Sequence, residues 1–96
     1  RDRFGELDIV AVRGDVLAIV EVRGLSDAAW VRPEQTVNHA KQTAVFHAGN
    51  RWLAAHPRMH GRYYVRFDVI GVVFATDELR HVEAAFTASD VRRFSR

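Results

Sequence analysis

Residues 6–23 read ELDIVAVRGDVLAIVEVR, and this stretch decides the fold. Two runs of apolar and β-branched residues, 6–12 and 16–22, are separated by the Arg-Gly-Asp of residues 13–15. Val and Ile favour strands, and a Gly-Asp pair between two such runs predicts a tight turn. We therefore expect a β-hairpin of two antiparallel strands.

The register of this hairpin follows from its turn. With residues 14–15 at the centre of the turn, Asp8 lies directly opposite Glu21. The same register places Glu6 opposite Arg23. Because side chains alternate along a strand, all four project from one face, and the opposite face is wholly apolar. The polar residues of the hairpin are therefore expected to gather at one end of one face.

Two carboxylates in direct opposition are unusual in a sheet. With their Cβ atoms about 5 Å apart, the repulsion is roughly 3 kcal/mol at an effective dielectric constant near 20. A shared proton or a divalent cation would relieve it, and two acidic oxygen donors favour Mg²⁺ or Mn²⁺. Alternatively, one acid pairs with Arg23 while the other reaches solvent. The residues alone leave both interpretations open for Asp8 and Glu21.

The remaining sequence predicts one long helix and two further strands. Apolar residues recur with a helical period from about 38 to 56, with Asn38 or Thr36 as N-cap and Gly49 packed closely on the sheet. The order β-β-α-β-β predicts a single domain over residues 1–96. The other expected segments are a loop, a third strand, a short edge strand and a terminal helical turn, over residues 24–33, 63–74, 79–84 and 89–94.

The expected strands are apolar on both faces, which is typical of a sheet covered on both sides. The long helix covers one side only. We therefore expect the other side to be covered by an N-terminal helix of the fold that these 96 residues do not contain, or by a second subunit in a homodimer.

Composition narrows the class of protein. The chain has no cysteine, no apolar run long enough to span a membrane and no signal-peptide pattern, so we expect a cytoplasmic protein without membrane contact. Its net charge is +2, and its basic residues are thirteen Arg and one Lys, Lys41. Arginine binds phosphate through two parallel hydrogen bonds, which suits nucleic acid. The plain alternative is that a GC-rich genome encodes Arg in place of Lys.

Three further residues are candidates with two interpretations each. Glu6 is either a third acidic ligand or the ion-pair partner of Arg23. Asp68 lies in an apolar strand, where we expect a neighbouring Arg or a backbone N–H to hold it rather than a metal. Trp30, beside Arg32, either stacks on a base or a second subunit, or packs locally. The histidines show no H-E-x-x-H spacing, so we expect no dedicated zinc site.

Three segments together resemble a known family. They are GELDIVAVRGDVLAIVEVR at 5–23, HAKQ at 39–42 and RFDVIGV at 66–72. The chain resembles, over residues 4–75, the YraN-type family of small bacterial endonuclease-like proteins, which usually read G-E-I-D-L-I-A, V-E-V-K, K-Q and R-F-D-V-V. This family is similar to archaeal Holliday-junction resolvases. The resemblance implies a restriction-endonuclease-like α/β fold of the PD-(D/E)XK superfamily.

The resemblance also implies roles for individual residues. Asp8 and Glu21 match the acids that hold the metal, and the carbonyl of Val22 commonly adds a ligand in such folds. Gln42 matches a glutamine that lies beside the active site in related nucleases. The lysine of the E-x-K motif is replaced by Arg23, which stays protonated and cannot act as a base.

Two functions follow from these expectations. The first is an Mg²⁺- or Mn²⁺-dependent endonuclease acting on structured or branched DNA, with DNA expected in preference to RNA. Arg32, Lys41 and Trp30 are then expected to contact the nucleic acid. The alternative is a catalytically weak or inactive nucleic-acid-binding module of the same fold, in which the apolar sheet face serves oligomerisation.

Overall fold

The chain forms a mixed α/β fold in a computed structural model that describes residues 7–26 and 31–93. Within those ranges there are four strands in one sheet, two α-helices and a short 3-10 helix. The expected order β-β-α-β-β is confirmed, and the 3-10 helix begins at Pro33, the last residue of the predicted loop. In chain order the elements are β1 (Ile9–Arg13), β2 (Val16–Leu25), η1 (Pro33–Thr36), α1 (His39–Ala55), β3 (Tyr64–Val73), β4 (Glu78–Phe86) and α2 (Ala88–Arg93).

The hairpin β1–β2 has the predicted register. Arg13 pairs with Val16 and Ile9 pairs with Val20, around a turn in which Gly14 has a φ of 62°. Such a positive φ is accessible to glycine at little cost, which explains the residue chosen for the turn. However, β1 begins at Ile9 and not at residue 6, because the Asp8 carboxylate itself accepts the N–H of Val22 and replaces the next main-chain bond of the ladder.

The sheet has the order β1-β2-β3-β4. β2 and β3 are parallel, with Glu21 beside Val69, and α1 provides the long connection that a parallel pair requires. β3 and β4 are antiparallel, and their register shifts between Phe67 and Val69. This irregularity opposite residue 68 becomes important for the only buried aspartate of the described residues.

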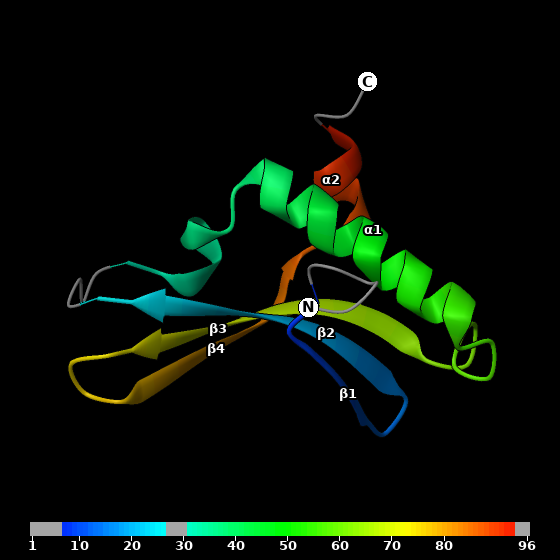
Figure 1. The fold of residues 1–96 in the computed structure, drawn as a ribbon, viewed down its shortest axis with the longest axis horizontal. Helices are drawn as coiled ribbons and strands as arrows, with labels where there is room; N and C mark the ends of the chain where they lie inside the picture. The colour runs from blue at the N-terminus through cyan, green and yellow to red at the C-terminus, as the bar shows by residue number, and fades with distance from the viewer. Residues whose placement is uncertain (1–6, 27–30, 94–96) are drawn as a thin grey trace.

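Both helices lie on one side of the sheet over the described residues (Figure 1). α1 begins at the predicted N-cap, since the Asn38 side chain accepts the N–H of Lys41. The predicted close packing of Gly49 is confirmed, because a Cβ there would lie 2.7 Å from the Cδ1 of Ile19. The buried core between the helices and the sheet contains Leu17, Ile19, Val37, Val45, Leu53, Phe67, Val69, Phe86 and Val91.

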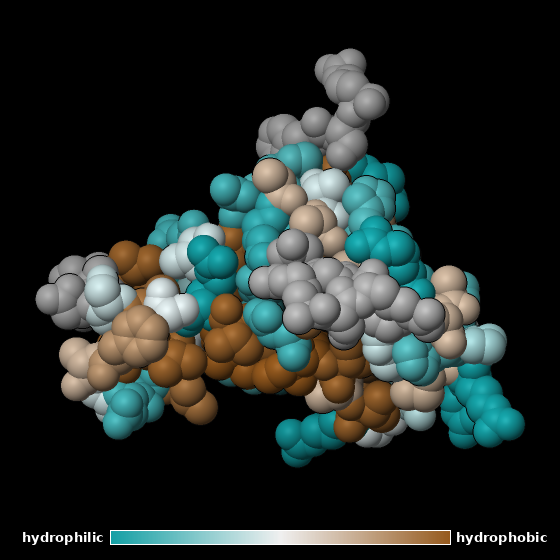
Figure 2. Space-filling view, viewed as in Figure 1, coloured by the Kyte–Doolittle hydropathy of each residue, from teal (hydrophilic) through white to brown (hydrophobic). Residues whose placement is uncertain are grey.

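The other side of the sheet is open in the part of the chain that the structure describes. Hydrophobic side chains are visible along the strands beneath α1 (Figure 2). On this open face Ile9 is 43% exposed and Val22 is 36% exposed, and a groove of about 540 Å³ runs between β1 and β4. The sequence predicts a sheet covered on both faces, and the described helices cover one of them.

Candidate metal centre

The two predicted acids lie at the end of the first hairpin, beside the start of α1. Glu21 projects from β2 toward the helices, and only 3% of its surface is exposed. Asp8 is exposed, and its Oδ2 accepts the N–H of Val22 at 2.9 Å. Because the N–H and C=O of one strand residue point to the same side, the Val22 carbonyl also points to the side of β2 on which β1 lies. Asp8 and Glu21 are close enough for the charge of Asp8 to act on Glu21.

The electrostatics of Glu21 show that its charge is poorly compensated. Burial raises the pKa of Glu21 above its ordinary value, and the neighbouring charge of Asp8 raises this pKa further. Lys41 acts in the opposite direction through its charge and a hydrogen bond. The Nζ of Lys41 lies 3.5 Å from Glu21 Oε2, and Nη1 of Arg23 lies 3.6 Å from the same oxygen.

The other carboxylate oxygen of Glu21 is different. Oε1 is buried and has no hydrogen-bond partner among the described residues. A buried carboxylate oxygen without a partner is costly, so a group that supplies a positive charge there would stabilise it. This oxygen, the carboxylate of Asp8 and the carbonyl of Val22 form a set of hard oxygen donors, which fits Mg²⁺ or Mn²⁺.

The donor set is small. Over residues 7–26 and 31–93, no three His, Asp or Glu side chains come together in a way that could hold a metal ion. Two carboxylates and a carbonyl leave further positions for water or substrate phosphate, which is the usual arrangement for Mg²⁺ in phosphoryl-transfer sites. Glu6, the expected third acid, lies outside the described residues.

The cations at the site are anchored differently. Arg23 donates from Nε to Thr36 Oγ1 at 3.3 Å, and the hydroxyl of Thr36 donates to the carbonyl of Pro33 at 2.7 Å. Lys41 instead reaches Glu21 from the first turn of α1. Sequence reasoning assigned Lys41 to a nucleic-acid surface and missed its contact with Glu21. The available signal was its place at the start of the helix that covers the carboxylate face.

The other predicted site residues lie apart from the two acids or outside the described ranges. Gln42 donates from Nε2 to the carbonyl of Val37 at 3.1 Å, so its amide secures the chain before α1 rather than contacting either acid. Arg32 is exposed, and its Nε lies 3.8 Å from Oε2 of Glu34 at the start of η1. Trp30 belongs to the residues that the structure does not describe.

Asp68 has its own partners on the open face of the sheet. Its two carboxylate oxygens each accept one hydrogen bond from Arg66 at 2.9 Å, and Oδ2 also contacts Nε2 of His81 at 2.8 Å. The N–H of Ala84, at the irregular part of β4, donates to Oδ1 at 3.0 Å. The expectation of an Arg and a backbone N–H is thus confirmed, and Asp68 is not available to the candidate metal centre.

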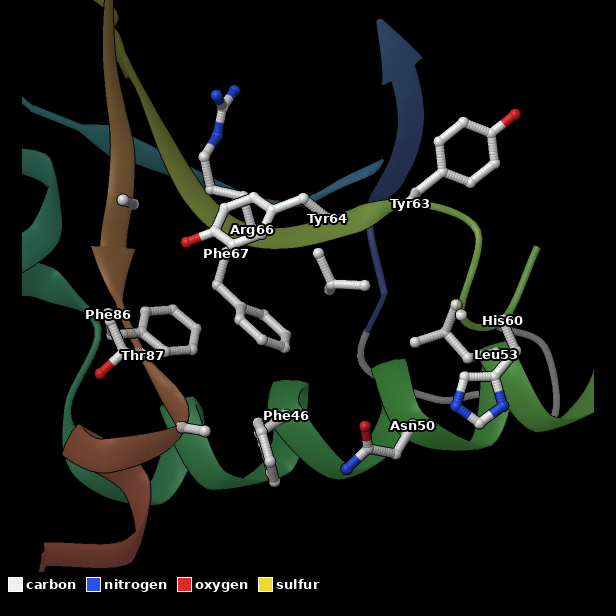
Figure 3. Close-up of a pocket in the computed structure, with 14 residues that line it drawn as sticks. Phe46, Asn50, Leu53, His60, Tyr63, Tyr64, Arg66, Phe67, Phe86 and Thr87 are labelled. Atoms are coloured by element: carbon white, nitrogen blue, oxygen red, sulfur yellow. The ribbon is translucent and has the colours of Figure 1, made fainter. Parts of the chain in front are cut away.

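Two hollows of the described surface are not lined by Asp8, Glu21 or Lys41. One is the groove of the open face. The other, of about 480 Å³, lies between α1 and the strands β3 and β4. In Figure 3 the rings of Phe46, Phe67 and Phe86 gather on the helix side, and Arg66 points away from them. Its aromatic lining is largely an extension of the core.

Comparison with known proteins identifies the family. The model of the family described as "Uncharacterised protein family UPF0102" matches residues 1–72. A UPF0102 protein of Myxococcus xanthus is 47% identical over 88 residues, which cover 90% of this chain and 68% of that protein. One of Anaeromyxobacter dehalogenans is 40% identical, with 90% and 64% covered. One of Bradyrhizobium diazoefficiens is 42% identical, with 93% and 64% covered.

These relatives are longer, since the chain spans about two thirds of their length. No helix of the described residues is both long and apolar enough to cross a membrane. The YraN-type resemblance seen in the hairpin, the helix start and the third strand is confirmed at the level of the family. The chain belongs to the uncharacterised protein family UPF0102.

Proposed function

We propose that the chain is the nuclease-like core of a metal-dependent endonuclease of the PD-(D/E)XK superfamily, which hydrolyses phosphodiester bonds in structured or branched DNA. The observation that carries this proposal is Oε1 of Glu21, which is buried without a hydrogen-bond partner among the described residues and belongs to a carboxylate close to Asp8. A buried carboxylate oxygen without a hydrogen-bond partner is costly, and a second carboxylate beside it raises that cost, so a bound cation would stabilise this pair.

The arrangement of elements supports the fold part of the proposal. A hairpin carries both acids at one end, a long helix follows, and the next strand returns parallel to β2. This places the start of α1 over the acids, where it contributes Lys41. The motifs that carry the resemblance to resolvase-like nucleases occur in this same order along the chain.

The residues have separate tasks in the proposed reaction. Asp8, Glu21 and the carbonyl of Val22 would hold Mg²⁺ or Mn²⁺. When bound, the ion would lower the pKa of a water and offset negative charge on the phosphate under attack. Arg23 occupies the lysine position of the motif, and its guanidinium can offset charge but cannot accept a proton.

Metal binding by the full-length chain tests the proposal first. Isothermal titration calorimetry with Mn²⁺ is expected to show saturable binding that Glu21→Gln abolishes and the double variant Asp8→Ala/Glu21→Ala also lacks. Glu34→Gln is the matched control, because Glu34 Oε1 is also buried with no hydrogen-bond partner in the described part of the chain but belongs to η1. Equal binding by Glu21→Gln and the wild type would refute the metal centre. Cleavage of a synthetic four-way DNA junction then tests the activity.

A second candidate function is favoured by the tether on Arg23. Because its Nε is bonded to Thr36, Arg23 is held as a structural link between β2 and η1. The chain would then bind nucleic acid without efficient cleavage. Arg23→Lys distinguishes the two functions: a large gain in junction cleavage identifies a weakened nuclease, and no change assigns the reactive cation to another residue.

A further inference from the structure

Two cations from different elements contact the same oxygen of Glu21. The guanidinium of Arg23 comes from β2 and the ammonium of Lys41 comes from α1, at 3.6 and 3.5 Å from Oε2. We propose that Lys41, and not Arg23, is the cation that contacts the phosphate at the candidate metal centre. This inference rests on the proposed function. Within that function, Lys41 takes the role of the lysine of the E-x-K motif, because Arg23 stands at the position of that lysine.

The contacts of Arg23 restrict its movement. Its Nε is used by Thr36, and the Thr36 hydroxyl is in turn bonded to the main chain at Pro33. Turning the guanidinium toward a phosphate would break this chain of hydrogen bonds. A planar guanidinium has a fixed geometry, so one anchored edge determines where the other edge points. Arg23 therefore serves to connect β2 with η1.

Lys41 differs from Arg23 in the chemistry of its charged group and in the contacts that position its side chain. Its ammonium is a compact charge with three donors on a four-carbon stem, so it can bond to Glu21 and to a phosphate oxygen together. The Lys41 side chain is 28% exposed and that of Arg23 is 37% exposed, so both cations reach solvent and their anchoring is what separates them. The charge of Lys41 and its hydrogen bond both lower the pKa of Glu21.

The start of α1 is built to hold Lys41 in this place. The Asn38 side chain accepts the N–H of Lys41 at 2.9 Å, and the Gln42 side chain donates to the carbonyl of Val37 at 3.1 Å. Both bonds secure the first turn of α1 against the preceding chain. Gln42 therefore stabilises the first turn of α1, and Lys41 contacts Glu21.

Lys41→Met tests the assignment, with Arg51→Met as the matched control because Arg51 is an exposed cation further along the same helix. Two quantities are measured on the full-length chain: the Mn²⁺ dissociation constant, and the salt dependence of binding to a four-way DNA junction in Ca²⁺. A lost phosphate contact lowers the slope of log K against log salt by about 0.9 for duplex DNA. We expect this reduction in Lys41→Met, no reduction in Arg51→Met, and Mn²⁺ binding retained in both.

Each other result has a definite meaning. If Lys41→Met is folded by circular dichroism but loses Mn²⁺ binding, Lys41 only supports Glu21 and the inference is wrong. An unchanged slope, or an equal reduction in Arg51→Met, also overturns it. If the wild type binds Mn²⁺ but not the junction, the inference falls while the metal centre stands. If the wild type does not bind Mn²⁺, the proposed function itself fails.

Discussion

At the scale of single residues, the two buried acids of the described sheet have opposite environments. Asp68 receives hydrogen bonds from a guanidinium, an imidazole and a backbone N–H. Glu21 has two cations at longer distances on one oxygen, and its other oxygen has no hydrogen-bond partner among the described residues. The complete hydrogen bonding of Asp68 stabilises the fold, whereas the unpartnered oxygen of Glu21 is the one that our proposal assigns to a metal ion.

The stability of the protein should depend on Asp68 and on pH. Burial raises the pKa of Asp68, but the hydrogen bonds from Arg66, Ala84 and His81 outweigh burial and hold this pKa below its ordinary value. The corresponding stability is present above the unfolded pKa of about 3.9 and is lost as pH falls through the lower folded value. Removing one partner of a buried pair costs about 3–5 kcal/mol.

We therefore expect Asp68→Asn to lower the free energy of unfolding by about that amount at pH 7. The variant should also lose less stability than the wild type as the pH is lowered below about 4. Urea denaturation at several pH values measures both effects. Asp77→Asn is the control, because Asp77 is an exposed turn residue with a φ of 59° that asparagine tolerates. Equal losses in the two variants would contradict a specific role for the Asp68 cluster.

At the scale of elements, the start of α1 links helix capping to the candidate metal centre. The Asn38 cap satisfies the N–H of Lys41, whose side chain contacts Glu21. Fraying of this turn would move the ammonium away from the acids. The N-cap is therefore expected to affect both the stability of α1 and the binding of nucleic acid.

Asn38→Ala should lower the free energy of unfolding by about 0.5–2 kcal/mol, the usual effect of losing an N-cap side chain. The same substitution at Asn50, an exposed interior position of α1, should instead be neutral or stabilising by up to about 0.7 kcal/mol, because alanine has the higher helix propensity. Thermal unfolding followed by circular dichroism compares the two variants. A stability loss in both, or in neither, would show that the cap does not determine the start of α1.

At the scale of the whole molecule, the two faces of the sheet have different environments. One face is covered by the helices and contains the candidate metal centre. In the described part of the chain the other face carries a groove, lined by apolar residues of β1 and β2 and by the charged cluster around Asp68. Exposed apolar surface of this kind favours association. Association of two copies through the open face therefore stays a prediction.

Sedimentation velocity at increasing protein concentration should detect this association. Ile70→Asp places a charge in the groove of the open face and should shift the chain toward the monomer. Phe74→Asp is the control, since Phe74 is 69% exposed but does not line the groove. A wild type that is monomeric at all concentrations would contradict association through this face.

The sequence by itself determined the hairpin, its register and the helix cap, because these depend on neighbours within a few residues. The Gly-Asp turn and the alternation of side chains sufficed to bring Asp8 and Glu21 to one end of one face. Asn38 was predictable as an N-cap from its side chain and the apolar period that follows it.

Only the tertiary structure decided which groups contact the two buried acids, Glu21 and Asp68. Lys41 reaches Glu21 because α1 crosses over the sheet to make β2 and β3 parallel, and no local rule specifies the position of a crossover helix to within a side chain. His81 and the N–H of Ala84 reach Asp68 because β4 departs from regular pairing beside it. Contacts between residues far apart in the chain depend on packing, and packing depends on every element at once.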